Sequence, residues 1–219
     1  MKLDATEVEA RRRERKPTDR LKIDAVIIDA VIIEVLKKEG RPTHRTRLVK
    51  LVYMIDHIYH RHFGQTLTGL SYMWDYFGPN AVSNAIVDRG DRLCTQKLLH
   101  LTRTPNQYGD FSYLYSLETP DVASPVELEP AALLIIDGVV RKYRNSTLEQ
   151  LVRASKRTEP FRRARPFEVL KMEKSSTYED LVKDIEADPQ FSADIRESIE
   201  HPSDGTTFTI HELEALYGG

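Results

Sequence analysis

The amino-acid sequence predicts a mainly α-helical α+β protein with a small antiparallel β-hairpin. Several long stretches repeat apolar residues at helical spacing, and one pair of short stretches has the composition of paired strands. The chain has 219 residues, of which 40% are hydrophobic. That length and composition suffice for one compact core with an extension beyond it.

The first two helices are predicted from apolar residues that recur every three or four positions. The first covers about residues 22–38 and is followed by Gly40 as a stop signal. The second begins at Thr43 or Thr46, reaches Phe63 and ends at Gly64. Its apolar stripe is broad and contains Leu48, Leu51, Val52, Ile55, Ile58 and Tyr59. We therefore expect the second helix at the centre of the core.

The middle of the chain mixes extended and helical signals. Residues 67–77 are rich in aromatic side chains and predict a short strand or extended segment. Pro79 and Gly90 bound a predicted third helix over residues 80–89. Residues 96–102 and 111–117 predict a β-hairpin, since Phe111, Tyr113 and Tyr115 alternate with other side chains.

Two further helices are expected at residues 130–143 and from Ser146 or Thr147 to Arg157. Ser146 is the expected cap of the second, Glu149 completes a capping box, and Pro160 ends it. Beyond Met172, residues 178–186 and 191–199 predict short amphipathic helices. Helices this short usually need a surface to pack on.

Charge divides the chain into three parts. Residues 173–219 contain twelve Asp and Glu against three Lys and Arg, a net charge of −9, which leaves +7 on residues 1–172 because the whole chain carries −2. We expect a basic N-terminal arm at 1–20, a folded domain at 21–170 and an acidic C-terminal extension at 171–219. Such asymmetry indicates that the body, the extension or both meet a charged partner.

Several function classes find no support in the sequence. The single Cys94 leaves neither a disulfide framework nor a thiol cluster, which favours the cytoplasm. No apolar run approaches the roughly 20 residues that span a bilayer. No phosphate loop or nucleophile motif is present, and His57, His60 and His62 fit a solvated helix end better than a metal site. We expect a protein that is no enzyme and uses no metal or cofactor.

Residues 48–80 carry a recognisable pattern. A Lys-Leu-Val-Tyr helix, Lys50–Tyr53, leads through a glycine turn into an aromatic segment that ends in Tyr-Phe-Gly-Pro, Tyr76–Pro79. This pattern resembles the Panacea domain, the SocA-like antitoxin domain common in phage-associated proteins. The resemblance covers about residues 20–165, and residues 155–161 represent the family's final short motif. The positions that match the family pattern are Lys50, Leu51, Tyr53, Trp74, Tyr76, Gly78, Pro79, Pro160 and Phe161.

The final motif departs from the family twice. Lys156 stands where the family often has His, and Phe161 replaces Trp. The resemblance implies an antitoxin without enzymatic activity that neutralises a cognate toxin by direct binding. It also implies a second mechanism, because at least one relative delivers its toxin to a protease as a degradation adaptor.

Two sets of residues are candidate partner contacts. The acidic extension, Tyr178–Tyr217, could fold around a toxin as it binds. Its apolar anchors would be Phe191, Ile195, Ile199, Phe208, Leu213 and Leu216. A basic cluster is formed by Arg153, Lys156, Arg157, Arg162, Arg163 and Arg165. It could bind phosphate, an acidic toxin surface or the chain's own acidic extension, or it is a solvated face. We expect Trp74, Tyr76 and Phe77 mainly in the core.

A DNA-binding transcriptional regulator, which would repress its own operon, is the alternative. The order helix–helix–strand–helix–hairpin resembles a winged helix. The basic cluster and the arm segment Arg11–Lys16 would contact the phosphates of operator DNA. Against this hypothesis, residues 80–89 offer only Asn80, Asn84 and Arg89 as base readers. The sequence indicates no oligomeric state.

Overall fold

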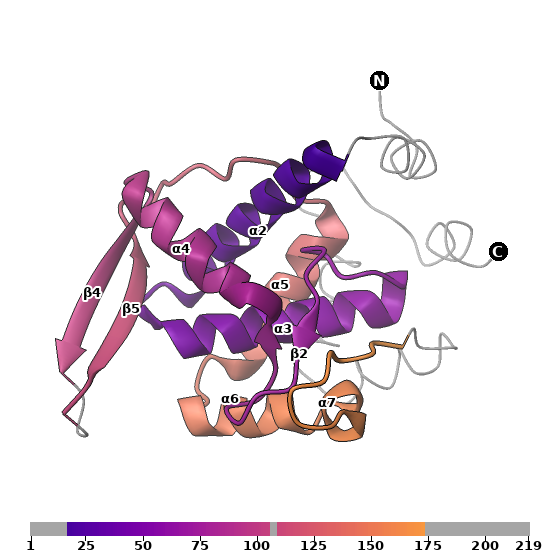
Figure 1. Ribbon diagram of the computed structural model, residues 1–219. Coiled ribbons are helices and arrows are strands. Elements are labelled where there is room, and N and C mark those ends of the chain that lie inside the picture. Colours follow the sequence, from indigo (N-terminus) through magenta and orange to yellow (C-terminus); the bar gives the residue numbers. More distant parts are fainter. Residues whose placement is uncertain (1–16, 106–108, 174–219) are drawn as a thin grey trace, which may run out of the picture. The chain divides into compact units, whose positions relative to one another are not determined.

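The computed structural model describes residues 17–105 and 109–173. This part of the chain is mainly helical with small antiparallel sheets, which confirms the predicted fold class (Figure 1). Its six α-helices are α2 (Pro17–Glu39), α3 (Arg45–Phe63), α4 (Ala85–Thr95), α5 (Pro130–Tyr143), α6 (Leu148–Lys156) and α7 (Glu159–Arg163). None of these helices is long and apolar enough to cross a membrane.

The strands form two separate sheets. β1 (Thr43–His44), β4 (Leu99–Pro105) and β5 (Phe111–Leu117) make a three-stranded antiparallel sheet in the order β1-β5-β4. In the predicted hairpin Leu99 pairs with Leu117, and β4 begins three residues later than expected. β2 (Tyr72–Met73) and β3 (Asn80–Ala81) form the second sheet. β1 and β3 were not predicted from the sequence.

α3 lies at the centre of the core, as its apolar stripe predicted (Figure 1). Leu48, Leu51, Val52 and Ile55 are fully buried, and α3 contacts α2, α5 and α6. The helix ends at Gly64 in the left-handed conformation, φ 74°, where its N–H donates to a carbonyl of the last turn at 2.8 Å. Gly64 is thus the predicted stop.

The predicted helix over residues 80–89 is wrong at both ends. The chain first forms β3 and a 3₁₀ turn (Val82–Asn84), and α4 starts at Ala85 and runs through Gly90 to Thr95. Gly90 does not stop the helix; it lets the Tyr115 ring approach. A Cβ at Gly90 would lie 2.8 Å from Tyr115 Cζ, closer than van der Waals contact allows.

Three other local predictions need correction. Of residues 67–77, only Tyr72–Met73 form a strand. The cap of α6 is Thr147 rather than Ser146, and its capping-box partner is Gln150 rather than Glu149. α6 ends at Lys156, within one residue of the predicted end, but Pro160 is not its stop, because Pro160 sits in the first turn of α7 where it needs no N–H partner. The short helices expected at residues 178–186 and 191–199 lie outside the described residues.

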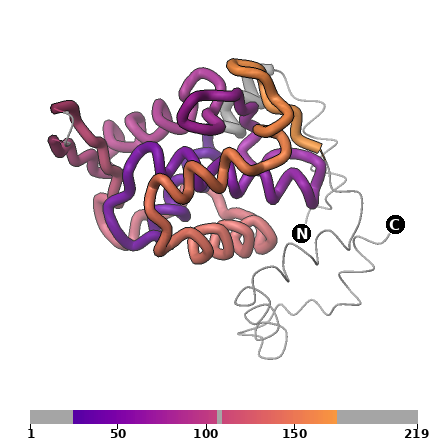
Figure 2. Tube along the Cα trace, turned by 90° about the horizontal axis from the view of Figure 1, so that it is seen from below, coloured from indigo at the N-terminus to yellow at the C-terminus, as the bar shows by residue number. Residues whose placement is uncertain are grey.

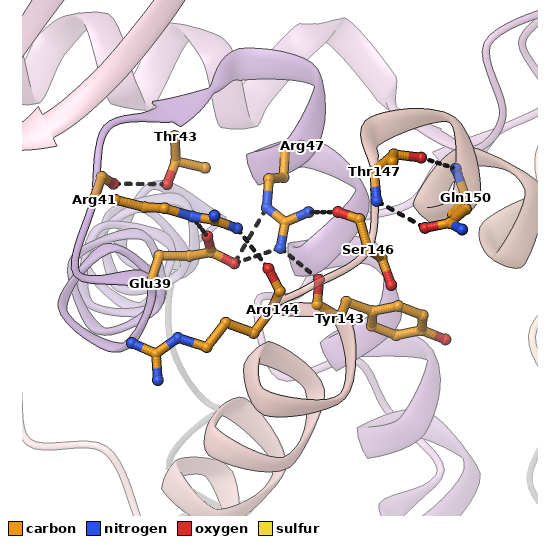
Figure 3. A network of polar contacts seen from close by, with 9 residues as sticks. All are labelled: Glu39, Arg41, Thr43, Arg47, Tyr143, Arg144, Ser146, Thr147 and Gln150. Carbon is orange, nitrogen blue, oxygen red and sulfur yellow. Dashed lines mark hydrogen bonds and ion pairs between the residues drawn. The ribbon is translucent and has the colours of Figure 1, made fainter.

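A buried arginine joins three helix ends (Figure 3). Arg47 Nη2 donates to Glu39 Oε1 at 2.7 Å and to the Tyr143 carbonyl at 2.7 Å, while Nη1 donates to the Ser146 carbonyl at 3.0 Å. These bonds connect the end of α2, the start of α3 and the turn between α5 and α6. The sequence pattern did not reveal this network, since its partners are far apart in the chain.

Candidate functional site

The residues that resemble the family motif come from three parts of the chain and meet beside α3. We call them the motif cluster: Lys50, Tyr53, Trp74, Gly78, Pro79, Lys156, Thr158 and Phe161. Lys50 Nζ donates to the Pro79 carbonyl at 2.7 Å, and Lys156 Nζ donates to the Tyr76 carbonyl at 2.5 Å. The segment after α7 returns to the same place (Figure 2). The Trp74 N–H donates to the Glu168 carbonyl, and the Leu170 N–H donates to the Tyr72 carbonyl.

Gly78 lies where these parts are closest. Its φ of +89° favours glycine, and a Cβ there would lie 2.9 Å from Ser155 Oγ. The same Cβ would lie 3.5 Å from Lys50 Cε and 3.5 Å from Lys156 Cγ. Only a glycine therefore lets the 75–79 loop pass between α3 and α6.

Lys50 is a buried cation whose charge is not balanced by a neighbouring carboxylate of the described residues. Its side chain is enclosed, with 2% of the residue exposed, and no described carboxylate lies within ion-pair distance of its Nζ. Burial lowers the pKa of Lys50 to about 8; the charge of Asp75 opposes that shift, and that of Lys156 adds to it. Lys50 is thus charged at neutral pH at a cost in folding free energy.

Tyr53 links α3 to the turn between α6 and α7. Its hydroxyl lies 2.6 Å from Thr158 Oγ1, which itself donates to the Ser155 carbonyl at 2.8 Å. The Tyr53 hydroxyl is therefore the donor in the first bond. Burial raises the pKa of Tyr53 to about 12, so it stays protonated and serves as a fixed hydrogen-bond donor.

The loop between β2 and β3 presents two aromatic rings to solvent. The Gly78 N–H donates to the Asp75 carbonyl at 2.9 Å, and the Phe77 N–H donates to Asp75 Oδ1 at 3.1 Å, which closes a tight turn. At its tip Tyr76 is 64% exposed and Phe77 72% exposed. The expectation of core positions is wrong for both, because the turn points their side chains away from α3.

Further aromatic rings continue this surface. Trp74 stacks on Phe161 at 5.3 Å between centroids, and Phe167 packs edge-on against Trp74 at 6.2 Å and Tyr76 at 5.5 Å. We call Trp74, Tyr76, Phe77, Phe167 and Val169 the aromatic surface. Phe167 and Val169 were not predicted as site residues; the signal that could have indicated them is two large apolar residues in an otherwise cationic stretch.

The basic cluster is partly neutralised by carboxylates that the sequence analysis did not pair with it. Arg153 binds Glu149, and Arg163 binds Glu159 and Glu173. Lys156 is held by the Tyr76 carbonyl. The remaining three, Arg157, Arg162 and Arg165, are exposed and have no carboxylate partner among the described residues.

A second polar site lies near the other end of α3. Asp56 is fully buried and accepts hydrogen bonds from the Thr68 N–H at 2.9 Å, the Thr68 hydroxyl and the Tyr72 hydroxyl at 2.6 Å. Burial nevertheless raises the pKa of Asp56 to about 6. The adjacent His57 stacks on Tyr53, and burial lowers its pKa to about 4. Asp56 thus holds the segment 68–72 against α3, whereas His57 packs on its own helix.

Three further observations concern metal binding and reactive side chains. Within residues 17–105 and 109–173, no group of three or more His, Cys, Asp or Glu side chains could hold a metal ion. Burial raises the pKa of Cys94, which disfavours a reactive thiolate. His57 is half-buried against Tyr53 rather than solvated. The hydrogen-bonding groups of the motif cluster hold backbone carbonyls and so fix the loop.

The tail residues that the sequence analysis singled out as toxin contacts lie outside the described residues. They are Phe191, Ile195, Ile199, Phe208, Leu213 and Leu216. Their role stays a prediction.

Comparison with known proteins gives one match. The family model described as antitoxin SocA-like, Panacea domain, matches residues 48–161, from α3 to the first residues of α7 and thus across the whole motif cluster. No curated protein and no solved structure matches the chain. With more than half of its length covered by that match, the chain belongs to the SocA-like antitoxin family that carries the Panacea domain.

Proposed function

We propose that this protein is an antitoxin that neutralises a cognate toxin by binding it directly in the cytoplasm, without catalysing a reaction itself. The observation that carries the proposal is the family match over residues 48–161. Membership of an antitoxin family implies a toxin as partner. Direct binding fits the motif cluster, whose cations and hydroxyls hold backbone and leave no group poised to react.

The acidic extension is the segment that we propose binds the toxin. It combines a net charge of −9 over residues 173–219 with apolar residues at helical spacing, such as Phe191, Ile195 and Ile199. Acidic side chains would speed encounter with a basic toxin surface, and the apolar ones would anchor the complex. Phe208, Leu213 and Leu216 would extend this contact.

Co-expression tests the proposal. The gene product encoded beside this chain is expressed alone, with the full chain, and with a chain that ends at Met172. We expect the full chain to restore growth and the shortened chain to restore it poorly. Circular dichroism of the shortened chain should still show the helical content of the folded body. Equal rescue by the shortened chain would exclude a role for the extension, and no rescue by the full chain would refute the antitoxin assignment.

The same cultures distinguish blocking from delivery to a protease. Direct blocking leaves the toxin at its usual abundance in a stable complex. An adaptor mechanism instead shortens the toxin's half-life when the antitoxin is present. Pulse-chase labelling of the toxin measures this difference.

DNA binding is the second candidate, and strand order favours it. The sequence α2, β1, α3, α4, β4, β5 with the sheet order β1-β5-β4 is the arrangement of a winged helix, in which α4 would enter the major groove. Arg89 is no longer a base reader, because its guanidinium is paired with Asp29. Exposed Arg92 and Lys97 are the cations left near the end of α4. A gel shift on the upstream DNA at several salt concentrations tests this function, and lack of salt-sensitive binding would refute it.

A further inference from the structure

Several of the most exposed apolar side chains of the body belong to the loop between β2 and β3 and to the segment after α7. Among the described residues the four most exposed large apolar side chains are Phe77, Tyr76, Phe167 and Val169, at 72, 64, 58 and 52%. All four belong to the aromatic surface. Isolated exposed apolar residues are ordinary, but exposed aromatic rings that pack on one another, as Tyr76 and Phe167 do, are typical of a contact site.

Phe77 is exposed and yet held in place. Its own N–H and that of Gly78 are bound by Asp75, which fixes the turn. The carbonyls on either side of it, those of Tyr76 and Pro79, each accept a bond from a lysine Nζ. A backbone turn fixed before binding loses little conformational entropy when a partner covers it, and aromatic side chains held at such positions are frequent binding hot spots.

The charge next to this surface is positive. Residues 153–172 contain seven Lys and Arg against two Glu. Arg162 and Arg165 have no carboxylate partner in the described structure, and they flank Phe161 and Phe167 in the chain. An acidic partner surface would complement this charge and would gain in association rate.

We propose that the aromatic surface is where the folded body contacts the toxin, with Phe77 as the anchor, and that the toxin offers an apolar pocket with an acidic rim. This inference rests on the proposed function. It assigns the toxin two unlike contacts, a basic face for the acidic extension and an acid-rimmed pocket for Phe77. Lys50 then serves the proposed contact despite its burial, because it binds the Pro79 carbonyl at the end of the loop that carries Phe77.

Binding of purified toxin to the full chain tests the anchor. The probe is the neighbouring gene product that the wild-type chain neutralises, and its dissociation constant is measured for wild type, Phe77→Ala and Phe111→Ala. Phe111 is the matched control because it is an exposed phenylalanine on the β4–β5 hairpin. We expect Phe77→Ala to weaken binding about 30-fold or more and Phe111→Ala to change it less than about 3-fold.

Charge reversal tests the rim. Arg162→Glu with Arg165→Glu is expected to lower the association rate about 10-fold at low salt, with the difference disappearing at high salt. Lys142→Glu with Arg144→Glu reverses the same charge on two exposed residues at the end of α5 and is expected to leave the rate near the wild-type value.

The outcomes separate this proposal from the function it rests on. A wild-type chain that neither binds nor neutralises the toxin would overturn both. Normal toxin binding and neutralisation by Phe77→Ala would overturn the contact surface alone. So would a wild-type dimer that Phe77→Ala converts to a monomer without loss of toxin binding, since the surface would then join two copies of this chain.

Discussion

Two buried cations, Arg47 and Lys50, lie one turn apart on α3 and differ in the partners that bind their charge. Arg47 meets the carboxylate of Glu39 and two backbone carbonyls, so its charge is matched and its donors are used. Lys50 meets the Pro79 carbonyl alone, and burial lowers its pKa to about 8. The first joins three helix ends, and the second holds the loop that carries Phe77.

The two cations therefore contribute differently to the stability of the fold. A matched buried pair adds little net free energy, but removing one partner leaves an uncompensated charge. An unmatched buried ammonium destabilises the fold throughout the neutral pH range. Under the proposed function this cost is offset, because Lys50 holds the turn that carries the proposed anchor Phe77.

Breaking the matched pair should have the largest effect. Glu39→Gln keeps the shape of the side chain but leaves Arg47 buried without a counter-charge. We expect a loss of about 3–5 kcal/mol in the free energy of unfolding and a Tm lower by about 10 °C or more. Urea unfolding of Glu39→Gln, Arg47→Met and the double variant measures the coupling. If the two changes are simply additive, the ion pair is not the link between these helices.

Asp56 and His57 extend the comparison to pH dependence. The pKa of Asp56 is raised to about 6, so the unfolded chain loses this proton first and stability falls as pH rises from about 4 to 6. The pKa of His57 is lowered to about 4, so stability falls instead as pH drops from about 6.5 to 4. The two slopes oppose each other, and each amounts to about 3 kcal/mol.

Single substitutions should separate the pH dependence of stability that comes from Asp56 from the one that comes from His57. Asp56→Asn leaves the His57 dependence, and the variant should lose stability relative to wild type as pH falls from 6 to 4. His57→Phe keeps a ring against Tyr53 and should gain stability relative to wild type over the same range. Urea unfolding at pH 4, 5, 6 and 7 checks both, and parallel curves for all three proteins would contradict the assignment.

The sequence predicted well what repeats locally. The apolar stripe of the central helix, its stop at Gly64 and the helix at residues 130–143 follow from a 3.6-residue period and end signals, and the structure confirms them. Gly90 shows the limit of such signals. A glycine can stop a helix or admit a neighbouring ring, and only the position of Tyr115 distinguishes the two.

In the candidate site, too, local motifs could be predicted from the sequence and contacts between distant residues could not. The motif residues Lys50, Gly78 and Pro79 were found from the sequence, but their contacts were not, because the partners lie up to about a hundred positions apart in the chain. The exposure of Tyr76 and Phe77 was missed because an aromatic run is usually core. The turn that exposes them depends on two lysines from distant helices.

Gly78 offers a sharper test of how tightly the loop is held. Gly78→Ala forces an unfavourable φ and also a Cβ 2.9 Å from Ser155 Oγ, whereas Gly109→Ala forces a similar φ, +80°, with no atom within 4 Å. We expect about 1 kcal/mol of destabilisation at Gly109 and about 2–3 kcal/mol at Gly78. Thermal unfolding of both variants compares them, and equal losses would show that the loop can move away from α6.

Lys50→Met should have the smallest effect on the free energy of unfolding. Unlike most substitutions of buried residues, it should leave the protein equally stable or more stable. Methionine keeps the apolar stem and removes the charge, so relief of the burial cost opposes the lost bond to Pro79. We expect the variant at pH 7 to be as stable as wild type or more stable by up to about 2 kcal/mol. Because the pKa of Lys50 is lowered, wild-type stability should rise from pH 8 to 10.5 relative to Lys50→Met, and the gap should close. A variant strongly destabilised at both pH values would mean that Lys50 supports the fold as Arg47 does, and the contrast between the two cations would fail.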